Sequence, residues 1–372
     1  MLTFNKYINE IEYICILGVL ILPFIVNLYH RVLRSDVSLV YSSNDVLIPM
    51  DASKILKAIC CIIIPIHHYG IFFCESRFVN IIRLAGGDVA LVLFLLLSAY
   101  GVLKSEQAKR LTVVGFIKTR LMKIYVPFVI ITTITVLLAI LVEAKAISPY
   151  PTNMSDDLVS IAAENNALRL VYMSCGIIEI DSSLWFVWVI LVSYIIFIFS
   201  KSIFDINYQK KQFLLTYIIL ILLYGLLCRF VISTPIHYYR NLWALVLGTI
   251  IALYEKELII NWIKGLLLLI SVVIYLWAQI ILMKEPTYFI YAILGLTMLL
   301  VMCLYTKTTT KPLSKYIVVL SSISYYIYLF HEKVFVFFNY YMGKTNVLPP
   351  LILIIIIAYI YNMVRTKIFF LK

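Results

Sequence analysis

Two ionisable residues, Lys57 and His68, lie within an otherwise apolar segment and are eleven residues apart. On an α-helix this separation is about three turns plus about 20°, so the two side chains share a face and lie about 16 Å apart along the axis. A histidine inside a membrane helix is costly to keep and by default indicates a functional site. The pair would place a proton acceptor within the membrane and a cation at the water boundary.

A second histidine, His67, precedes His68 and lies about 100° away from it round a regular helix, so both cannot face one site. Pro65 removes a backbone hydrogen bond just before the pair and can bend the helix there. We assign His68 as the candidate catalytic residue and keep His67 as its alternative. A core histidine satisfied by a neighbouring helix is the competing interpretation.

A cluster of cations follows in the segment that contains Lys118, Arg120 and Lys123. Arg120 and Lys123 are three residues apart at the start of a predicted helix, so they lie on one side of it. Such a cluster suits phosphates or a pyrophosphate. Anchoring of the helix at the cytoplasmic face, with contact to lipid headgroups, explains the same residues and is favoured by spacing alone.

Three weaker signals come from single residues. Ser98 could hydrogen-bond a ligand, although the small residues around it favour close helix packing instead. Trp185 opens a span after a long loop, where an interfacial anchor is the simplest interpretation. His331 could bind substrate or join a network with Glu332 and Lys333, and an interfacial polar cluster is the alternative.

The composition excludes a soluble protein. Of the 372 residues 63% are hydrophobic and only 13% are charged. Long apolar stretches bounded by charge are typical of a multi-pass membrane protein, so the lipid bilayer is an expected partner. The net charge of +12 is best explained by basic loops that orient the helices, and no nucleic-acid partner is expected.

The predicted fold is an all-α membrane bundle of about eleven transmembrane helices. Their alternation places the N-terminus outside and the C-terminus in the cytoplasm. It also puts 21 of the 31 Lys and Arg residues on the cytoplasmic side, as the positive-inside rule requires. The predicted spans are 13–30, 55–74, 86–104, 120–144, 184–200, 213–232, 240–254, 265–283, 287–305, 316–338 and 349–368.

The longest predicted loop, residues 145–183, lies outside. It is too long for a simple connection, so a lid or substrate loop and a surface loop are both open interpretations. The seven cysteines form no CxxC pair, and we expect them to pack as small apolar residues. No carboxylate–histidine cluster has metal-ligand spacing, so no metal is implied.

Five segments in sequence order resemble the acyltransferase-3 family of integral membrane acyltransferases, which O-acylate bacterial surface polysaccharides. The family has an Arg, ten residues and a His on its first core helix, where this chain has Lys57 and His68. Its later motifs resemble the segments around Ser98, Arg120 and Trp185. The remaining matched positions are Phe94, Ala99, Tyr100, Lys123, Ile124, Pro127, Phe186, Ser324, Tyr325, Tyr328, Leu329 and His331.

The resemblance covers about residues 50–370 and implies ten core helices. Residues 1–48 would then be an added N-terminal helix and loop, and residues 49–372 the membrane acyltransferase domain. Lys57 and Lys123 depart from the family's arginines, and Lys lacks the bidentate geometry of Arg. The chain also has no appended extracytoplasmic esterase-like domain, so a separate extracytoplasmic protein is a possible partner.

The resemblance implies transfer of an acyl group, with acetyl expected, from cytoplasmic acyl-CoA to a sugar hydroxyl. The acceptor would be a surface polysaccharide such as capsule or O-antigen, or its lipid-linked precursor, and the location the bacterial inner membrane. Lys57, Arg120, Lys123 and Ser98 would bind acyl-CoA, and His68 would be the general base or a transient acyl carrier. The expected substrate-binding residues are Trp185, Tyr325 and His331.

Two other classes of function remain open on the sequence. A transporter or flippase of a lipid-linked sugar would use His68 and Lys57 as a relay. Against it, the chain shows no inverted repeat and no paired broken helices. A structural or regulatory membrane protein would bind acyl-CoA without turning it over.

Overall fold

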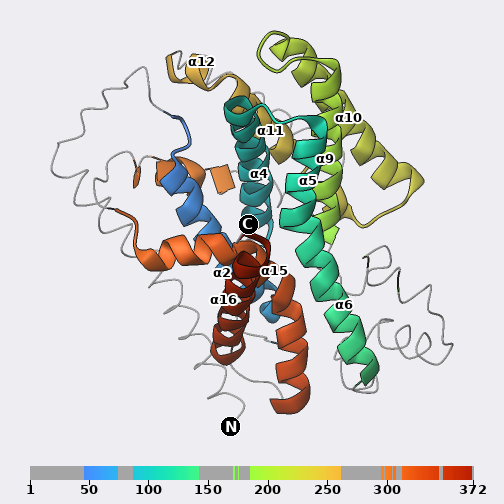
Figure 1. Cartoon of the computed structure of the whole chain (residues 1–372), viewed down its shortest axis with the longest axis vertical. Coiled ribbons are helices and arrows are strands. Elements are labelled where there is room, and N and C mark those ends of the chain that lie inside the picture. Colours follow the sequence, from blue (N-terminus) through green and yellow to red (C-terminus); the bar gives the residue numbers. More distant parts are fainter. Residues whose placement is uncertain are drawn as a thin grey trace. The chain divides into compact units, whose positions relative to one another are not determined.

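The regular secondary structure of the described residues is helical. The computed structural model describes residues 46–73, 87–141, 171, 175, 185–260, 295–296, 298–303, 305–306, 312–342 and 347–370. Every regular element within these residues is a helix, and no strand occurs among them (Figure 1). Five of the described helical segments are long and apolar enough to cross a membrane. The predicted class, an all-α membrane protein, is confirmed, whereas the predicted number of eleven helices includes spans outside the described residues.

The chain divides into two compact units. Unit 1 comprises Met1–Arg110 and Ile203–Ser324, and unit 2 comprises Leu111–Ser202 and Tyr325–Lys372. The long helix α15 (Lys315–Met342) begins in unit 1 and ends in unit 2.

The remaining helices are assigned to the units as follows. Unit 1 contains α2 (Met50–Phe73), α4 (Gly87–Lys109), α10 (Lys210–Leu226), η4 (Leu227–Val231), η5 (Ile236–Tyr238), α11 (Trp243–Leu253) and α12 (Glu255–Ile260). Unit 2 contains α5 (Val113–Arg120), η2 (Leu121–Tyr125), α6 (Val126–Leu141), α9 (Trp185–Ile203, of which the last residue belongs to unit 1) and α16 (Leu348–Phe370).

In unit 1, helix α4 is the centre of the packing. It is apolar almost all round, as expected of a helix buried on every side, and it packs against both α2 and α11. At the α11 contact, a Cβ on Gly248 would lie 2.3 Å from the carbonyl oxygen of Leu96 and 3.2 Å from Cβ of Ala99. Only glycine permits this approach. The predicted role of the small residues near Ser98 in close helix packing therefore holds for Ala99.

At one end of unit 1, a buried carboxylate links three segments of the chain. Glu255, at the start of α12, is 5% exposed. Its Oε1 accepts hydrogen bonds from the backbone N–H of Leu47 at 2.7 Å and the hydroxyl of Tyr100 at 2.6 Å, and its Oε2 pairs with Lys104 at 2.6 Å. These residues come from three segments whose ends are predicted on the same side of the membrane. The contacts therefore agree with the predicted alternation of the helices.

In unit 2, α5, η2 and α6 follow one another as a single rod (Figure 1). The rod begins at Val113 because the hydroxyl oxygen of Thr112 accepts the backbone N–H of Gly115 at 3.1 Å, an N-cap. The span predicted at 120–144 therefore starts about two turns too late. Arg120 and Lys123 lie within this rod and not at its beginning.

Aromatic rings join the rod to α9 inside unit 2. Phe116 is fully buried and stacks on Phe197 with a centroid distance of 5.6 Å. Trp188 contacts the rings of Tyr125 and Phe128, each at 6.4 Å. The first half of the rod is thus fixed against α9 on both sides of η2.

Eight of the eleven predicted spans fall on described helices. The spans 13–30 and 265–283, most of 287–305 and nearly all of the 145–183 loop lie outside the described residues. The domain boundary at residue 48 stays a prediction.

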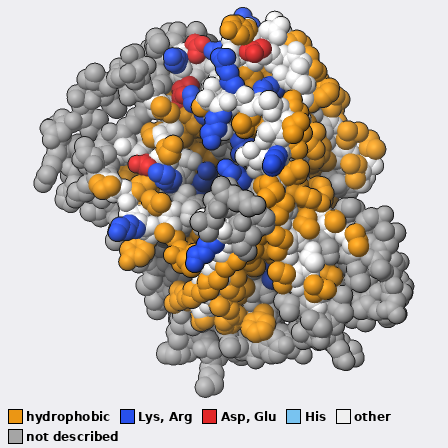
Figure 2. All heavy atoms as spheres, in the orientation of Figure 1, with side chains coloured by type: hydrophobic (Ala, Val, Ile, Leu, Met, Phe, Trp, Pro, Cys, Tyr) orange, Lys and Arg blue, Asp and Glu red, His pale blue; other side chains and the backbone are white. Residues whose placement is uncertain are grey.

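Apolar side chains are exposed on the outer faces of the spanning helices. On α10 they include Leu215, Ile219, Leu222, Leu223 and Leu226. Figure 2 shows hydrophobic side chains over this region of the surface. Such a surface would be unfavourable in water and is typical of contact with lipid.

Candidate functional site

Helix α2 carries the first group of candidate residues on one uninterrupted helix. It continues through Pro65 to Phe73, so the eleven-residue spacing of Lys57 and His68 keeps them on one face. Both residues are half-buried, whereas Cys61, which lies between them on that face, is buried. The predicted helix and shared face are confirmed.

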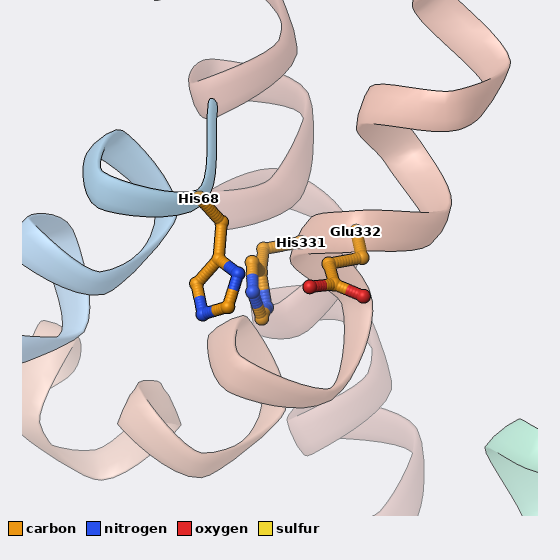
Figure 3. Close-up of side chains that lie close together, drawn as sticks. All are labelled: His68, His331 and Glu332. Carbon is orange, nitrogen blue, oxygen red and sulfur yellow. The ribbon is translucent and has the colours of Figure 1, made fainter. Parts of the chain in front are cut away.

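His67 and His68 have different surroundings within unit 1. The imidazole of His67 covers Gly87, the first residue of α4, so closely that a Cβ there would lie 2.5 Å from its Nε2. The His68 ring is edge-on to that of His67, with a centroid distance of 5.1 Å. His67 is therefore a packing residue against α4, which favours His68 as the chemically active member. Figure 3 shows the His68 imidazole extending from the last turns of α2.

The two histidines lie near the end of one helix and the start of another. His68 stands five residues before the end of α2, and its neighbour His67 lies beside the start of α4. The pair thus lies near one end of the α2–α4 contact. Glu255 lies at the opposite end, because it contacts Tyr100 and Lys104 in the later part of α4.

A buried ion pair lies at the histidine end of unit 1. Asp88, next to Gly87, accepts hydrogen bonds from the Arg240 guanidinium and from Nδ2 of Asn241, the latter at 3.3 Å. Asp88 and Asn241 are 9% and 6% exposed. The sequence interpretation missed this pair. The available signal was that both charges interrupt apolar segments at ends predicted on the same side. The consequence of the pair is to fix the start of α4, and with it the surface beneath His67.

His237, in the turn before α11, is a further histidine of this end that the sequence interpretation missed. Burial, and to a lesser extent the positive Arg240 and the nearby His68, lower its pKa to about 4. His237 is therefore neutral at physiological pH. Its ring stacks on Tyr238 with a centroid distance of 5.2 Å.

His237 should make the fold sensitive to acid. Between its unfolded pKa of about 6.5 and its folded value of about 4, the unfolded chain binds more protons, so stability falls as the pH falls through this window. Replacing His237 with Gln should reduce that fall and leave stability at pH 7.5 unchanged. Thermal unfolding of both proteins in detergent across this range measures the difference. Identical pH profiles would contradict the assignment.

Ser98 lies on the accessible side of α4. Phe94, Ser98 and Gly101 recur at helical spacing and are at least partly accessible, while most of the helix is buried. A Cβ on Gly101 would meet no atom within 4 Å. Ser98 is thus partly accessible, whereas Ala99 packs against α11.

In unit 2, Arg120 ends α5 and Lys123 lies in the π-helical turn η2. The Arg120 guanidinium carbon lies 5.3 Å from the ring centroids of both Phe116 and Tyr194. Contact with two aromatic faces stabilises a cation and leaves its N–H groups to donate elsewhere. Its Nε has no hydrogen-bond partner among the described residues.

Tyr325 belongs to the same unit and contacts the π-turn directly. Its hydroxyl donates to the carbonyl oxygen of Ile124 at 2.8 Å. Arg365 on α16, which the sequence interpretation did not select, donates to the carbonyl oxygen of Met122 at 3.0 Å and to the hydroxyl of Tyr326. An arginine in the last turns of the final span was the available signal.

Trp185 and His331 also belong to unit 2. Trp185 is the first residue of α9, as expected of an anchor at a helix end, and the next residue, Phe186, contacts Tyr328 at 5.5 Å. His331 is fully buried, and its Nδ1 lies 2.5 Å from the carbonyl oxygen of Tyr328. A carbonyl only accepts, so Nδ1 donates and Nε2 is the basic nitrogen of the neutral ring.

The surroundings of His331 differ from the predicted ones. Helix α15 continues to Met342, so His331 lies nearer its middle than its end. Glu332, the next residue on the helix (Figure 3), is only 2% exposed. The two residues are therefore buried groups of the protein interior.

The structure divides the candidate residues between the two units. Unit 1 holds Lys57, His67, His68 and Ser98, together with the Asp88–Arg240 pair and His237. Unit 2 holds Arg120, Lys123, Trp185, Tyr325 and His331, together with Arg365. Unit 1 thus offers imidazoles suited to proton transfer, and unit 2 offers cations suited to anion binding.

Comparison with known proteins identifies the family to which the chain belongs. No curated protein and no solved structure matches the chain. The model of the acyltransferase-3 family, described as an acyltransferase domain, matches residues 51–362. This range includes every candidate residue named from the sequence. The chain therefore belongs to the acyltransferase-3 family of membrane acyltransferases.

Proposed function

We propose that the protein transfers an acetyl group from cytoplasmic acetyl-CoA to a sugar hydroxyl of a bacterial surface polysaccharide or its lipid-linked precursor. The observation that carries the proposal is the family match over residues 51–362. The apolar spanning helices support a location in the inner membrane. The N-terminus would lie outside and the C-terminus in the cytoplasm.

His68 is the proposed catalytic residue. As a general base it takes the proton of the sugar hydroxyl while that oxygen attacks the thioester carbonyl, and the CoA thiolate leaves. As an acyl carrier its imidazole attacks the thioester first and the CoA thiolate leaves; the sugar oxygen then attacks the acetyl-imidazole, and the released imidazole takes the hydroxyl proton. Both routes need the neutral imidazole. The packing of His67 against Gly87 supports the choice of His68.

Unit 2 would supply the principal cations for acetyl-CoA. The Arg120 guanidinium lies against the rings of Phe116 and Tyr194. Lys123 lies three residues further along the chain, in the π-turn. Guanidinium and ammonium groups bind phosphates by charge-assisted hydrogen bonds. Lys57 and Ser98 in unit 1 are the other proposed donor-binding residues.

The sugar acceptor would be bound by Trp185, whose ring suits a sugar face, and by His331. The basic Nε2 of His331 can accept a hydrogen bond from a hydroxyl. The proposal includes hand-over to a separate extracytoplasmic protein if the final acceptor lies beyond this chain's reach.

The test is glycan analysis of a strain that lacks the gene. Loss of an O-acetyl group, restored by the wild-type gene but not by His68→Gln, would support the proposal. Loss of the whole polymer would point instead to transport or assembly of a lipid-linked sugar. An unchanged glycan would refute both.

A further inference from the structure

The π-turn that carries Lys123 leaves the backbone carbonyl of Met122 without a helical donor. The backbone N–H of Val126 bonds to the carbonyl of Leu121, five residues back, and not to that of Met122. Pro127, five residues after Met122, has no N–H that could take the place of the lost donor. A π-turn in a helix is rare, so this geometry needs support from outside the rod.

Arg365 supplies that support at Met122. Its Nη2 donates to the Met122 carbonyl at 3.0 Å, and its Nη1 donates to the hydroxyl of Tyr326. The guanidinium carbon also lies 5.8 Å from the centroid of the Tyr326 ring. Both terminal nitrogens of the Arg365 guanidinium therefore donate hydrogen bonds within unit 2, and these bonds fix the position of the guanidinium.

Tyr325 supplies a second support, two residues along the turn. Its hydroxyl donates to the carbonyl of Ile124 at 2.8 Å. The two supported carbonyls flank Lys123 in the chain, and Arg120 is the last residue before the turn. Because a π-turn is wider than an α-turn, it changes the direction in which Lys123 leaves the rod relative to Arg120.

We propose that Arg365 and Tyr325 are positioning residues: they hold the π-turn and thereby set the arrangement of Arg120 and Lys123 that binds the phosphates of acyl-CoA. This inference rests on the proposed function. Arg365 lies outside the residues that the family model matches, and its guanidinium acts through the backbone of the turn. It is not itself assigned to the phosphates.

The experiment is steady-state kinetics of the full-length protein in lipid nanodiscs, with acetyl-CoA varied at saturating acceptor. Arg365→Ala should raise KM for acetyl-CoA by about tenfold, the effect of one lost charged hydrogen bond, while kcat changes by less than about threefold. Lys367→Ala is the matched control, because Lys367 is an exposed cation on the same helix. It should leave KM unchanged.

Two further variants separate positioning from folding. Tyr325→Phe removes only the hydroxyl and should raise KM in the same direction, even if Arg365→Ala fails to fold. Pro127→Ala restores an N–H, so the segment can return to a regular α-helix in which no carbonyl lacks a donor. A purely structural role predicts normal KM in Pro127→Ala, whereas positioning predicts a raised KM.

The outcomes also separate this inference from the proposed function. An active wild type with normal KM in both Tyr325→Phe and Pro127→Ala would overturn the positioning role alone. A wild-type protein that does not turn over acetyl-CoA would overturn the proposed function and this inference with it. A raised KM in Tyr325→Phe and Pro127→Ala, with Lys367→Ala unaffected, supports the inference.

Discussion

Replacing His68 with glutamine should reduce acetyl transfer by about 10²–10⁴-fold, the usual contribution of a general base. Glutamine keeps the polar character and approximate size of the side chain but cannot take the proton or carry the acetyl group. Transfer from labelled acetyl-CoA in membranes measures the loss, with protein level and topology checked in parallel. The effect should fall on kcat, since His68 is not proposed to bind CoA phosphates.

His67→Gln is the matched control, because it changes the adjacent imidazole. His67 packs against Gly87, so its loss should affect packing and leave transfer well above that of His68→Gln. Full activity in His68→Gln would refute the assignment of this residue. Loss confined to His67→Gln would move the catalytic role to the neighbour.

Replacing Asp88 with alanine should have the largest effect on stability. The change leaves the Arg240 guanidinium, which is only 18% exposed, without its carboxylate and removes a partner of Asn241. Breaking a buried ion pair in this way costs about 3–5 kcal/mol. The partial exposure of Arg240 places the expected loss at the lower end of the range for buried pairs. Thermal unfolding of the purified protein in detergent measures the loss as a lower midpoint temperature.

Two variants serve as controls for Asp88→Ala. Asp51→Ala breaks the exposed Lys54–Asp51 pair and should cost less than about 1 kcal/mol. The double variant Asp88→Leu with Arg240→Leu removes both charges and should recover most of the stability, because apolar residues can replace a buried pair. If Asp88→Ala lowers the midpoint no more than Asp51→Ala, the buried pair does not hold the start of α4.

The helices and the shared face of Lys57 and His68 could be predicted because both follow from local periodicity. Apolar length predicts a spanning helix, and an eleven-residue spacing predicts one face whatever packs against it. The packing role of Ala99 followed from residue size for the same reason. These inferences need no knowledge of which helices are neighbours.

The missed features all depend on contacts between distant segments. The Asp88–Arg240 pair joins residues 152 positions apart, and Arg365 reaches a carbonyl 243 positions away. The π-turn lies where Pro127 removes one donor, and Arg365 and Tyr325 donate to the carbonyls of Met122 and Ile124. The burial of His331 depends on the segments that pack around α15. Sequence spacing along one helix contains none of this information.

The most direct measurement of the central claim is acetyl transfer by the purified protein in lipid nanodiscs. Labelled acetyl-CoA would be supplied together with membranes from a strain that lacks the gene, which contain the unmodified acceptor. We predict release of CoA and saturable appearance of labelled O-acetyl groups on the glycan, with both lost in His68→Gln. Acetyl-CoA that stays intact in the presence of acceptor, with no label on the glycan, would contradict the account.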